Sequence, residues 1–198
     1  MSMSNSKKPR IKRGPPPKKP IKRHRHREAL PELIRDFGPR CAYSMQHQSR
    51  SGTLEVDHFD PRKKKDLFQE YKNLFPASRH CNGKKSDIWP NKAEIAAGCR
   101  FLNPCEEMDY DEQIFENPQT HELVGATPAA RWHIRICGLN ANHLTEERRR
   151  RAKHWNTIRN QGVTIKGGVP HQIAQEMIEN YREEVELMIP PIPPPPSH

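Results

Sequence analysis

The stretch of the chain that decides the fold lies between residues 41 and 87. It contains Cys-Ala-Tyr-Ser (41–44), Leu-Glu-Val-Asp-His-Phe-Asp-Pro (54–61), Tyr-Lys-Asn-Leu (71–74) and Arg-His-Cys-Asn-Gly-Lys-Lys-Ser-Asp (79–87). An acid and a histidine stand side by side in the second segment, and an asparagine follows in each of the next two. Carboxylate, imidazole and amide groups gathered in one short stretch indicate a site of chemistry.

The same stretch predicts the elements that carry these groups. Residues 53–59 alternate polar and apolar side chains with the period of a strand, and we expect them to form a hairpin with residues 41–45. Residues 60–71 are polar and basic, which favours a loop, and residues 77–85 favour a short helix. The acid and the histidine therefore lie near the end of a predicted strand.

Further elements are predicted on both sides of this stretch. Residues 28–37 place four apolar side chains on one helical face, and the Gly-Pro that follows should end the helix. Residues 101–130 contain seven acids and no Lys or Arg. Within and after this acidic segment we expect strands at 113–116, 122–126 and 133–137.

Two amphipathic helices are predicted in the last third of the chain, one with an apolar stripe from Leu144 to Ile158 and one from Ile173 to Met188. Helices and strands together indicate an α+β protein. The expected organisation is a disordered arm (1–27), a folded domain (28–188) divided into a core (38–90) and an extension (91–188), and a Pro-rich tail (189–198).

The positive charge is concentrated at the N-terminus. The chain has 198 residues with 34 Lys and Arg against 24 Asp and Glu, a net charge of +10. Residues 1–27 hold eleven of the basic residues and no acid, and they are rich in proline, so we expect a disordered polycation that contacts a polyanion such as DNA. The tail at 189–198 favours polyproline II, either as a docking segment or as a stiff end.

The composition also indicates the cellular compartment of the protein. No run approaches the ~20 apolar residues that a membrane helix needs, and the N-terminus lacks the apolar segment of a secretory signal. Five cysteines are an odd number and do not indicate a secreted disulfide framework. We therefore expect a cytoplasmic protein without a membrane partner.

His58 is the residue best suited to catalysis. Hydrolysis of a phosphodiester needs a base that activates water and a cation that stabilises charge on the phosphate. Imidazole titrates near neutrality, which suits it to the first task. A surface histidine that merely follows a strand is the alternative.

The four quoted segments resemble the HNH nucleases, whose ββα-metal core is two strands and a helix around one divalent metal. The match consists of Asp57-His58, an Asn-Leu at 73–74 and Cys-Asn-x-x-Lys at 81–85, in the family's order. The segment 82–87 also resembles the HNH domain of guide-directed CRISPR nucleases. The resemblance implies an α+β fold with flanking helices and a small β-hairpin, and an endonuclease acting on DNA.

The resemblance also implies roles for individual residues. His58 would be the general base, Asn73 would fix the loop and orient His58, and Asp57 and Asn82 would hold Mg²⁺ or Mn²⁺ through hard oxygen atoms. Asp57 and His58 point to opposite faces of a regular strand, so the strand must end or twist there for both to share one site. The residues expected to hold the phosphate backbone are Lys85, Arg62, Lys63, Lys64 and Lys65.

The chain departs from the family at the structural zinc that many HNH proteins carry. The two Cys-x-x-Cys pairs are replaced by Cys41 with Ser44 and by Ser78 with Cys81, and a hydroxyl is a poor zinc ligand. We expect no structural zinc. The alternative is a set in which His47 and His80 replace the two serines.

Segments downstream of the motif resemble the HNH subunit of Septu-type and some retron anti-phage systems, in which the nuclease works with an ABC-type ATPase. The resembling segments are residues 100–107, the acidic hairpin and residues 136–148. A freestanding restriction-like or mobile-element nuclease and a non-catalytic nucleic-acid-binding module are the alternatives. Because one active site cuts one strand, duplex cleavage would need a dimer, sequential nicks or an assembling partner.

Overall fold

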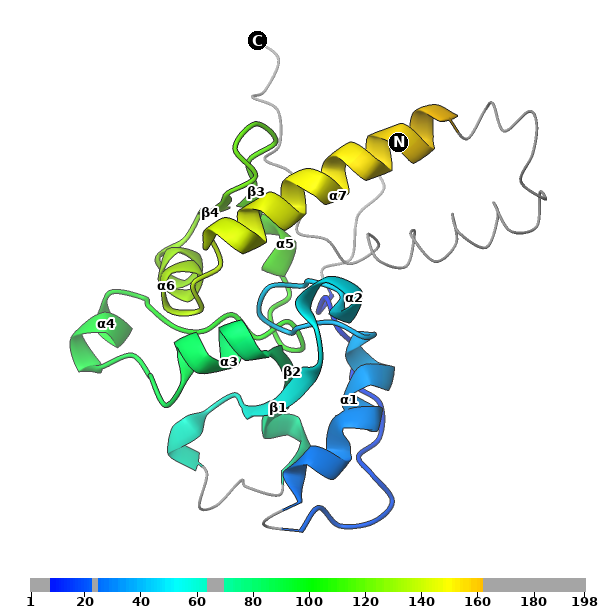
Figure 1. Ribbon diagram of the computed structural model, residues 1–198. Coiled ribbons are helices and arrows are strands. Elements are labelled where there is room, and N and C mark those ends of the chain that lie inside the picture. Colours follow the sequence, from blue (N-terminus) through cyan, green and yellow to red (C-terminus); the bar gives the residue numbers. More distant parts are fainter. Residues whose placement is uncertain (1–7, 23–24, 64–69, 162–198) are drawn as a thin grey trace, which may run out of the picture.

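The protein is described by a computed structural model that covers residues 8–22, 25–63 and 70–161 (Figure 1). Lys64, Lys65, the helix expected from Ile173 to Met188 and the Pro-rich tail lie outside these residues. The described chain combines helices with two small antiparallel sheets, which confirms the α+β class. Among the helices it contains, none has the length and apolar character needed to cross a bilayer.

In chain order the described elements are η1 (His26–Ala29), α1 (Leu30–Phe37), α2 (Gln48–Ser51), β1 (Leu54–His58), η2 (Pro61–Lys63), η3 (Tyr71–Asn73), β2 (Leu74–Ser78), α3 (Arg79–Lys85), α4 (Lys92–Ala96), α5 (Tyr110–Gln113), β3 (Ile114–Glu116), β4 (Leu123–Gly125), α6 (Pro128–Ile136) and α7 (Asn142–Gln161).

The helix predicted at 28–37 is present as η1 and α1. Leu33 and Phe37 lie one turn apart, and both are buried. The helix ends at Gly38, whose φ of 66° lies in the left-handed region that glycine adopts at little cost. The apolar stripe of α1 packs against β2, so this helix covers one side of the first sheet.

The predicted strand at 53–59 is present as β1, but its partner is β2 and not residues 41–45. The strands are antiparallel, with Asp57 opposite Phe75 and His58 opposite Leu74. Residues 41–45 instead form a turn, in which the Met45 N–H donates to the Cys41 carbonyl at 2.9 Å. The hairpin prediction was therefore wrong, because a Pro-containing segment that is buried throughout shows no alternation and does not signal a strand.

Helix α3 follows β2 without a loop and packs against both strands of this sheet. It begins at Arg79, two residues later than predicted, because Ser78 caps it by accepting the N–H of Cys81 at 3.3 Å. Two strands and a helix thus form one unit, in which β1 carries Asp57 and His58.

In the extension, the strands predicted around the Asn-Pro turn are present as β3 and β4. The strand predicted at 133–137 was wrong, because this segment belongs to helix α6. Thr127 caps this helix by accepting the N–H of Ala130 at 3.1 Å, and Pro128 occupies its first turn. Gly125 lets the helix approach β4, since a Cβ there would lie 2.4 Å from the backbone nitrogen of Arg131.

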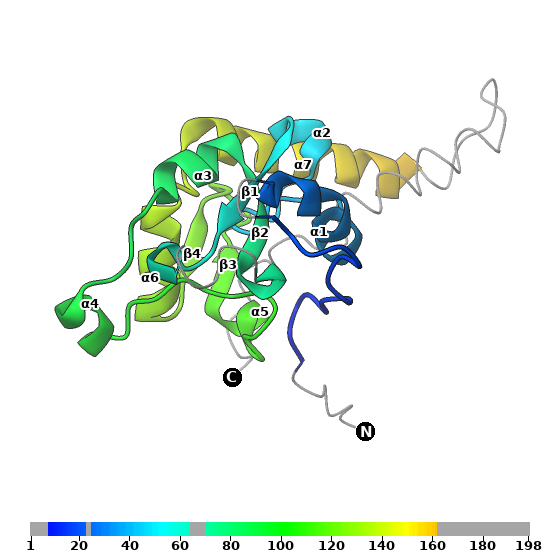
Figure 2. The ribbon, with the colours of Figure 1, turned by 90° about the horizontal axis from the view of Figure 1, so that it is seen from below.

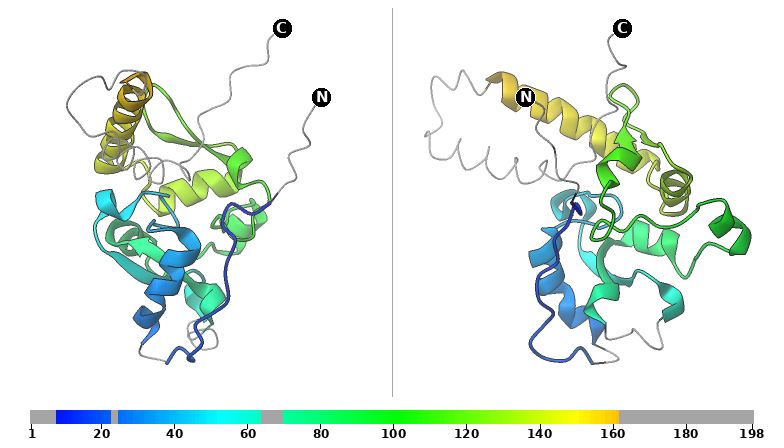
Figure 3. Two further views of the ribbon diagram at one scale, coloured as in Figure 1. Left: turned by 90° about the vertical axis from the view of Figure 1, so that its right-hand side faces the viewer. Right: turned by 180° about the vertical axis from the view of Figure 1, so that it is seen from behind.

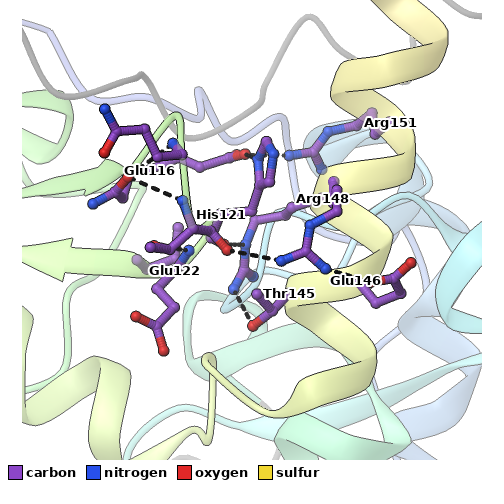
Figure 4. A network of polar contacts seen from close by, with 12 residues as sticks. Glu116, His121, Glu122, Thr145, Glu146, Arg148 and Arg151 are labelled. Atoms are coloured by element: carbon purple, nitrogen blue, oxygen red, sulfur yellow. Dashed lines mark hydrogen bonds and ion pairs between the residues drawn. The ribbon is translucent and has the colours of Figure 1, made fainter.

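A buried arginine attaches helix α7 to the β3–β4 turn (Figure 4). The guanidinium of Arg148 donates to the carbonyl of His121 at 2.6 Å and to the carbonyl of Leu139 at 2.9 Å. Glu116 joins the same network, bonding His121 at 2.8 Å and Arg151 at 3.0 Å. Burial lowers the pKa of Arg148 to about 10, which still leaves the side chain charged at neutral pH.

Residues 8–22 differ from the disordered arm that was expected. They run beside α1 (Figure 3). The Arg35 guanidinium of this helix donates to the Pro15 carbonyl at 2.8 Å. Ile11 and Ile21 are only 3% and 8% exposed and join the cluster formed by α1 and β2. The charge pattern concealed these contacts, because two isoleucines among eleven cations do not predict a core.

Candidate functional site

The chain just beyond β1 is held by the side chain of Asn73. The ladder to β2 continues past His58, because the Phe59 N–H donates to the Asn73 carbonyl at 2.8 Å. The Asn73 side-chain oxygen accepts the N–H of Asp60 at 2.9 Å, and its amide nitrogen donates to the Asp60 carbonyl at 3.2 Å. This buried amide fixes the loop after His58, the position that the motif implies for it.

The carboxylate of Asp57 is surrounded by donors from outside β1. The ammonium of Lys85 lies 2.8 Å from Asp57 Oδ2, and it also donates to the backbone carbonyl of His58 at 2.8 Å. The hydroxyl of Tyr43 donates to the same carboxylate oxygen. Burial, together with the neighbouring charge of Asp57, raises the pKa of Tyr43 well above its ordinary value, so the phenol stays a donor.

Lys85 is not exposed to solvent, as a contact with phosphate would require. Its side chain is fully buried between α3 and β1, with the rings of Tyr43 and Phe101 5.8 and 5.5 Å from the ammonium. A phosphate cannot reach a cation that is sealed inside the domain. The expectation that Lys85 holds the nucleic-acid backbone is therefore corrected: in this arrangement it neutralises Asp57.

Asn82 lies in the interface between α3 and β1, where its amide nitrogen donates to the Glu55 carboxylate at 2.7 Å. Glu55 and Asp57 are two residues apart and share one face of β1, while Asn82 and Lys85 are three apart on α3. The interface therefore contains two parallel contacts, Asn82 with Glu55 and Lys85 with Asp57. Asp57 and Asn82 face the same interface, but each already has a different partner.

Whether these residues can bind a divalent cation depends on Asp57. The oxygen atoms of Asp57 and Asn82 have the chemistry that Mg²⁺ or Mn²⁺ prefers. A metal at Asp57 would nevertheless compete with the Lys85 ammonium for the same oxygen. Within residues 8–22, 25–63 and 70–161, no group of three or more His, Cys, Asp or Glu side chains could hold a metal ion. As arranged here, the residues do not fit a divalent cation.

His58 points away from Asp57, as the alternation of a strand requires. Its ring lies beside the ring of His26 from η1, with 5.2 Å between the centroids and 56° between the planes. Its exposed fraction is 6%. The structure therefore separates His58 from the Asp57–Lys85 pair and brings it against η1, which begins within the last residues of the basic arm.

Two residues near the site were missed from the sequence. The strand alternation that placed Asp57 also places Glu55 on the same face, and this signal was present in the sequence. His26 gave no signal, because its sequence neighbours are cations of the basic arm. Its approach to His58 depends on how η1 packs against β1.

Of the basic run expected to contact phosphate, Arg62 is described in detail. Its guanidinium pairs with the Asp60 carboxylate at 2.9 Å and lies 4.4 Å from the ring centroid of Trp89. More than half of the Arg62 side chain is exposed. Lys63 ends η2, directly after Arg62. Arg62 therefore remains accessible to a ligand, with its position set by Asp60.

The four positions that the resemblance equates with the zinc ligands of HNH proteins, Cys41, Ser44, Ser78 and Cys81, lie together. Cys41 and Cys81 are both fully buried free thiols. Burial opposes ionisation of Cys41, but hydrogen bonds with Cys81 and Ser44 lower its pKa below the ordinary thiol value. The bond to Cys41, followed by burial, raises the pKa of Cys81. A hydrogen-bonded cluster of thiols and hydroxyls thus joins the turn at 41–45 to α3.

The alternative zinc set of Cys41, His47, His80 and Cys81 is not assembled. His47 Nδ1 lies 2.8 Å from the Ser49 hydroxyl, where it caps α2. His80 Nε2 lies 3.0 Å from the Gly138 carbonyl. Both imidazoles are therefore engaged with other parts of the fold.

Comparisons of the chain with protein-family models, with curated proteins and with solved structures found no match. The resemblance to the HNH nucleases therefore rests on the motifs themselves and on the residues that carry them.

Proposed function

We propose that this chain is a metal-dependent endonuclease of the HNH type that hydrolyses phosphodiester bonds of DNA. The observation that supports the proposal best is the convergence of the three motif segments on one strand–strand–helix unit. His58 ends β1, Asn73 fixes the loop beyond it, and Asn82 stands on α3 against the same strand. A packing role alone does not require an imidazole at this place.

In this proposal His58 is the general base. Its imidazole accepts a proton from a water molecule while the water oxygen forms a bond to phosphorus. The bond from phosphorus to the leaving oxygen breaks, and that oxygen takes a proton from solvent. Asn73 acts as a positioning residue, because it holds the backbone of Asp60 two residues after His58.

The requirement for Mg²⁺ or Mn²⁺ rests on the resemblance of the motifs. Asp57 is neutralised by Lys85 in the described arrangement, so no step of the reaction is derived through a metal at this carboxylate. Omission and addition of divalent cations test the requirement directly.

The proposal extends to the biological setting. The likeness of residues 100–107 and 136–148 to the HNH subunit of Septu-type and some retron systems supports an effector role in anti-phage defence with an ABC-type ATPase. A freestanding restriction-like or mobile-element nuclease would cut without such a partner. Dependence of cleavage on the ATPase distinguishes these two settings.

A second candidate function is a non-catalytic nucleic-acid-binding module. The ion pair between Lys85 and Asp57, together with the burial of His58, favours it. A binding module needs neither an open carboxylate nor an accessible base. It would retain DNA in the presence of EDTA and give no product under any condition.

The deciding experiment incubates supercoiled plasmid with the wild-type chain, with His58→Ala and with His143→Ala as a matched control. His143 is an exposed histidine on α7 whose ring lies 4.5 Å from that of His80, and it is not one of the residues proposed to act in catalysis. Each protein is tested with EDTA, Mg²⁺ or Mn²⁺, with and without the product of the neighbouring gene. We expect metal-dependent nicking or linearisation that is lost in His58→Ala and kept in His143→Ala. Plasmid retention without cleavage in every combination would instead assign the binding module.

A further inference from the structure

We propose that residues 11–22 form a fixed cationic strap that binds the phosphate backbone of DNA and leads it toward His58. The inference rests on the proposed function, because it identifies how the substrate of that same site is held. It differs from a free basic tail in two respects. The fold positions the cations that contact DNA, and some of the basic residues bind other parts of the protein instead of DNA.

Two isoleucines anchor the strap at its ends. Ile11 and Ile21 lie in the cluster formed by α1 and β2. The backbone N–H of Ile11 also donates to the Pro104 carbonyl at 2.8 Å. Pro15, Pro16 and Pro17 lie between these anchors and fix φ near −65°, which keeps the backbone extended. The strap is thus held at both ends and stiff between them.

Arg13 attaches the middle of the strap to the domain. Its guanidinium donates to the carbonyl of Tyr71 at 3.0 Å and to the carbonyl of Leu74 at 2.8 Å. The same group lies 4.5 Å from the ring centroid of Phe75 and 5.1 Å from that of Phe37. A guanidinium that satisfies two carbonyls and lies over aromatic rings is engaged by the fold. Arg13 is therefore excluded from the set that contacts phosphate.

Four lysines of the strap point to solvent. Lys12, Lys18, Lys19 and Lys22 are exposed, and in the part of the chain that the structure describes none of them forms an ion pair with an acid. Hollows of about 520 and 540 Å³ border the strap, one against α1 and one against Tyr71. The segment around Lys18 and Lys19 therefore stands off the domain, with its charges open to a ligand.

In the sequence the strap leads to η1, which packs against the strand that carries the candidate catalytic histidine. Lys22 precedes His26 by four residues, and the His26 ring lies 5.2 Å from that of His58. A phosphate backbone that follows the strap in the direction of the chain therefore approaches the base that would act on it. The strap lies beside α1, on the side of the molecule opposite α4 (Figures 1 and 2).

The chemistry of the strap favours a nucleic acid over an anionic membrane. Binding to a membrane surface uses aromatic or apolar side chains that enter the lipid, and residues 8–22 contain no aromatic residue. Both of their isoleucines are buried. Four exposed lysines on a Pro-rich backbone offer charges to the phosphates of a nucleic acid. Because the fold already orders the backbone, binding does not have to order it again.

The test compares two variants with the same net charge. The strap variant is Lys12→Gln, Lys18→Gln, Lys19→Gln and Lys22→Gln combined. The control variant is Lys92→Gln, Arg135→Gln, Arg149→Gln and Arg150→Gln combined, which removes four exposed cations from α4, α6 and α7, away from the strap (Figure 2). Affinity for a short labelled DNA duplex is measured in EDTA over a salt series, and melting curves verify that both variants fold.

We expect the salt slope of the strap variant to fall by about 3 to 4, because each phosphate contact contributes about 0.9 to the slope. The control should keep the wild-type slope. Equal losses in both variants would overturn the strap, since they would show that only net charge matters. Binding of the wild-type chain to phosphatidylserine vesicles but not to DNA would overturn it in favour of a membrane. Because EDTA removes cleavage from the readout, a chain that never cuts DNA still tests the strap.

Discussion

The ammonium of Lys85 lies 2.8 Å from the carboxylate of Asp57, and both side chains are buried between β1 and α3. Removing one partner from such a pair leaves an uncompensated charge, which costs about 3–5 kcal/mol. We therefore expect Lys85→Met to lower the free energy of unfolding by about this amount. Adding Asp57→Asn should restore much of the loss, because the double variant buries no charge. Urea unfolding of the wild-type chain, the two single variants and the double variant gives the coupling energy between Lys85 and Asp57.

The neighbouring Lys84 provides the control for this cycle. It is exposed on the same helix, and Lys84→Met should change stability by less than about 0.5 kcal/mol. If Lys85→Met were as mild as Lys84→Met, the ion pair would not hold α3 to β1. Asp57 would then be open to a metal ion, as the HNH resemblance implies.

His133 makes stability depend on pH. It is fully buried and accepts the N–H of Leu102 at Nδ1, 3.2 Å away, and burial lowers its pKa to about 4. The unfolded chain binds this proton near pH 6.5, so between about pH 6.5 and 4 the unfolded state holds more protons than the folded state. Stability should therefore fall as the pH falls through this window, by an amount on the order of 3 kcal/mol.

The variant His133→Asn separates this effect from the carboxylates of the protein. Asparagine retains an acceptor for Leu102 but does not titrate. Urea unfolding near neutral pH and near pH 4 should give the variant a lower stability at neutral pH and a flatter pH dependence. The same pH dependence in both chains would assign the acid lability to other groups.

Replacing Arg148 by lysine should lower the stability of the protein. Its planar guanidinium serves the carbonyls of His121 and Leu139 at once, which a lysine ammonium on a flexible stem does not reproduce. Leaving one buried acceptor unpaired costs about 1–3 kcal/mol, and we expect Arg148→Lys to lower stability within this range. Arg150→Lys, on the exposed side of α7, should have almost no effect. Differential scanning calorimetry compares the two, and equal melting temperatures would contradict the role of the Arg148 network.

The sequence predicted those elements whose local signals agree with their packing. Helix α1 has an apolar stripe and a terminal Gly-Pro, and β3 and β4 flank a clear turn. Helix α6 was mistaken for a strand because His133 to Cys137 alternate in polarity, while the Thr127–Pro128 start signal lies upstream of that window. Strand β2 was missed because it is buried on both sides and contains a proline.

The sequence predicted a set of candidate residues but not the pairings that the fold gives them. Asn73 holds the loop after His58, in the position that the motif implies. The resemblance implied that Lys85 holds phosphate, which requires an exposed side chain, as most lysines have. Its burial against Asp57 depends on how α3 packs on β1, and one sequence does not encode that relationship locally. The contact of His26 with His58 likewise depends on tertiary packing.

The packing of the strap yields the last prediction. Ile11 is 3% exposed, and replacing a buried isoleucine by alanine costs about 2–5 kcal/mol in a well-packed core. Because the strap can detach and recover chain entropy, we expect Ile11→Ala to fall at the low end, near 2 kcal/mol. Lys12→Ala, at the exposed neighbouring position, should leave the melting temperature unchanged. Hydrogen exchange at the Ile11 amide should accelerate in the Ile11 variant, since its bond to Pro104 depends on the same anchor. A fully stable Ile11→Ala chain would show that residues 8–22 contribute nothing to the fold and would return them to the free polycation that composition alone suggests.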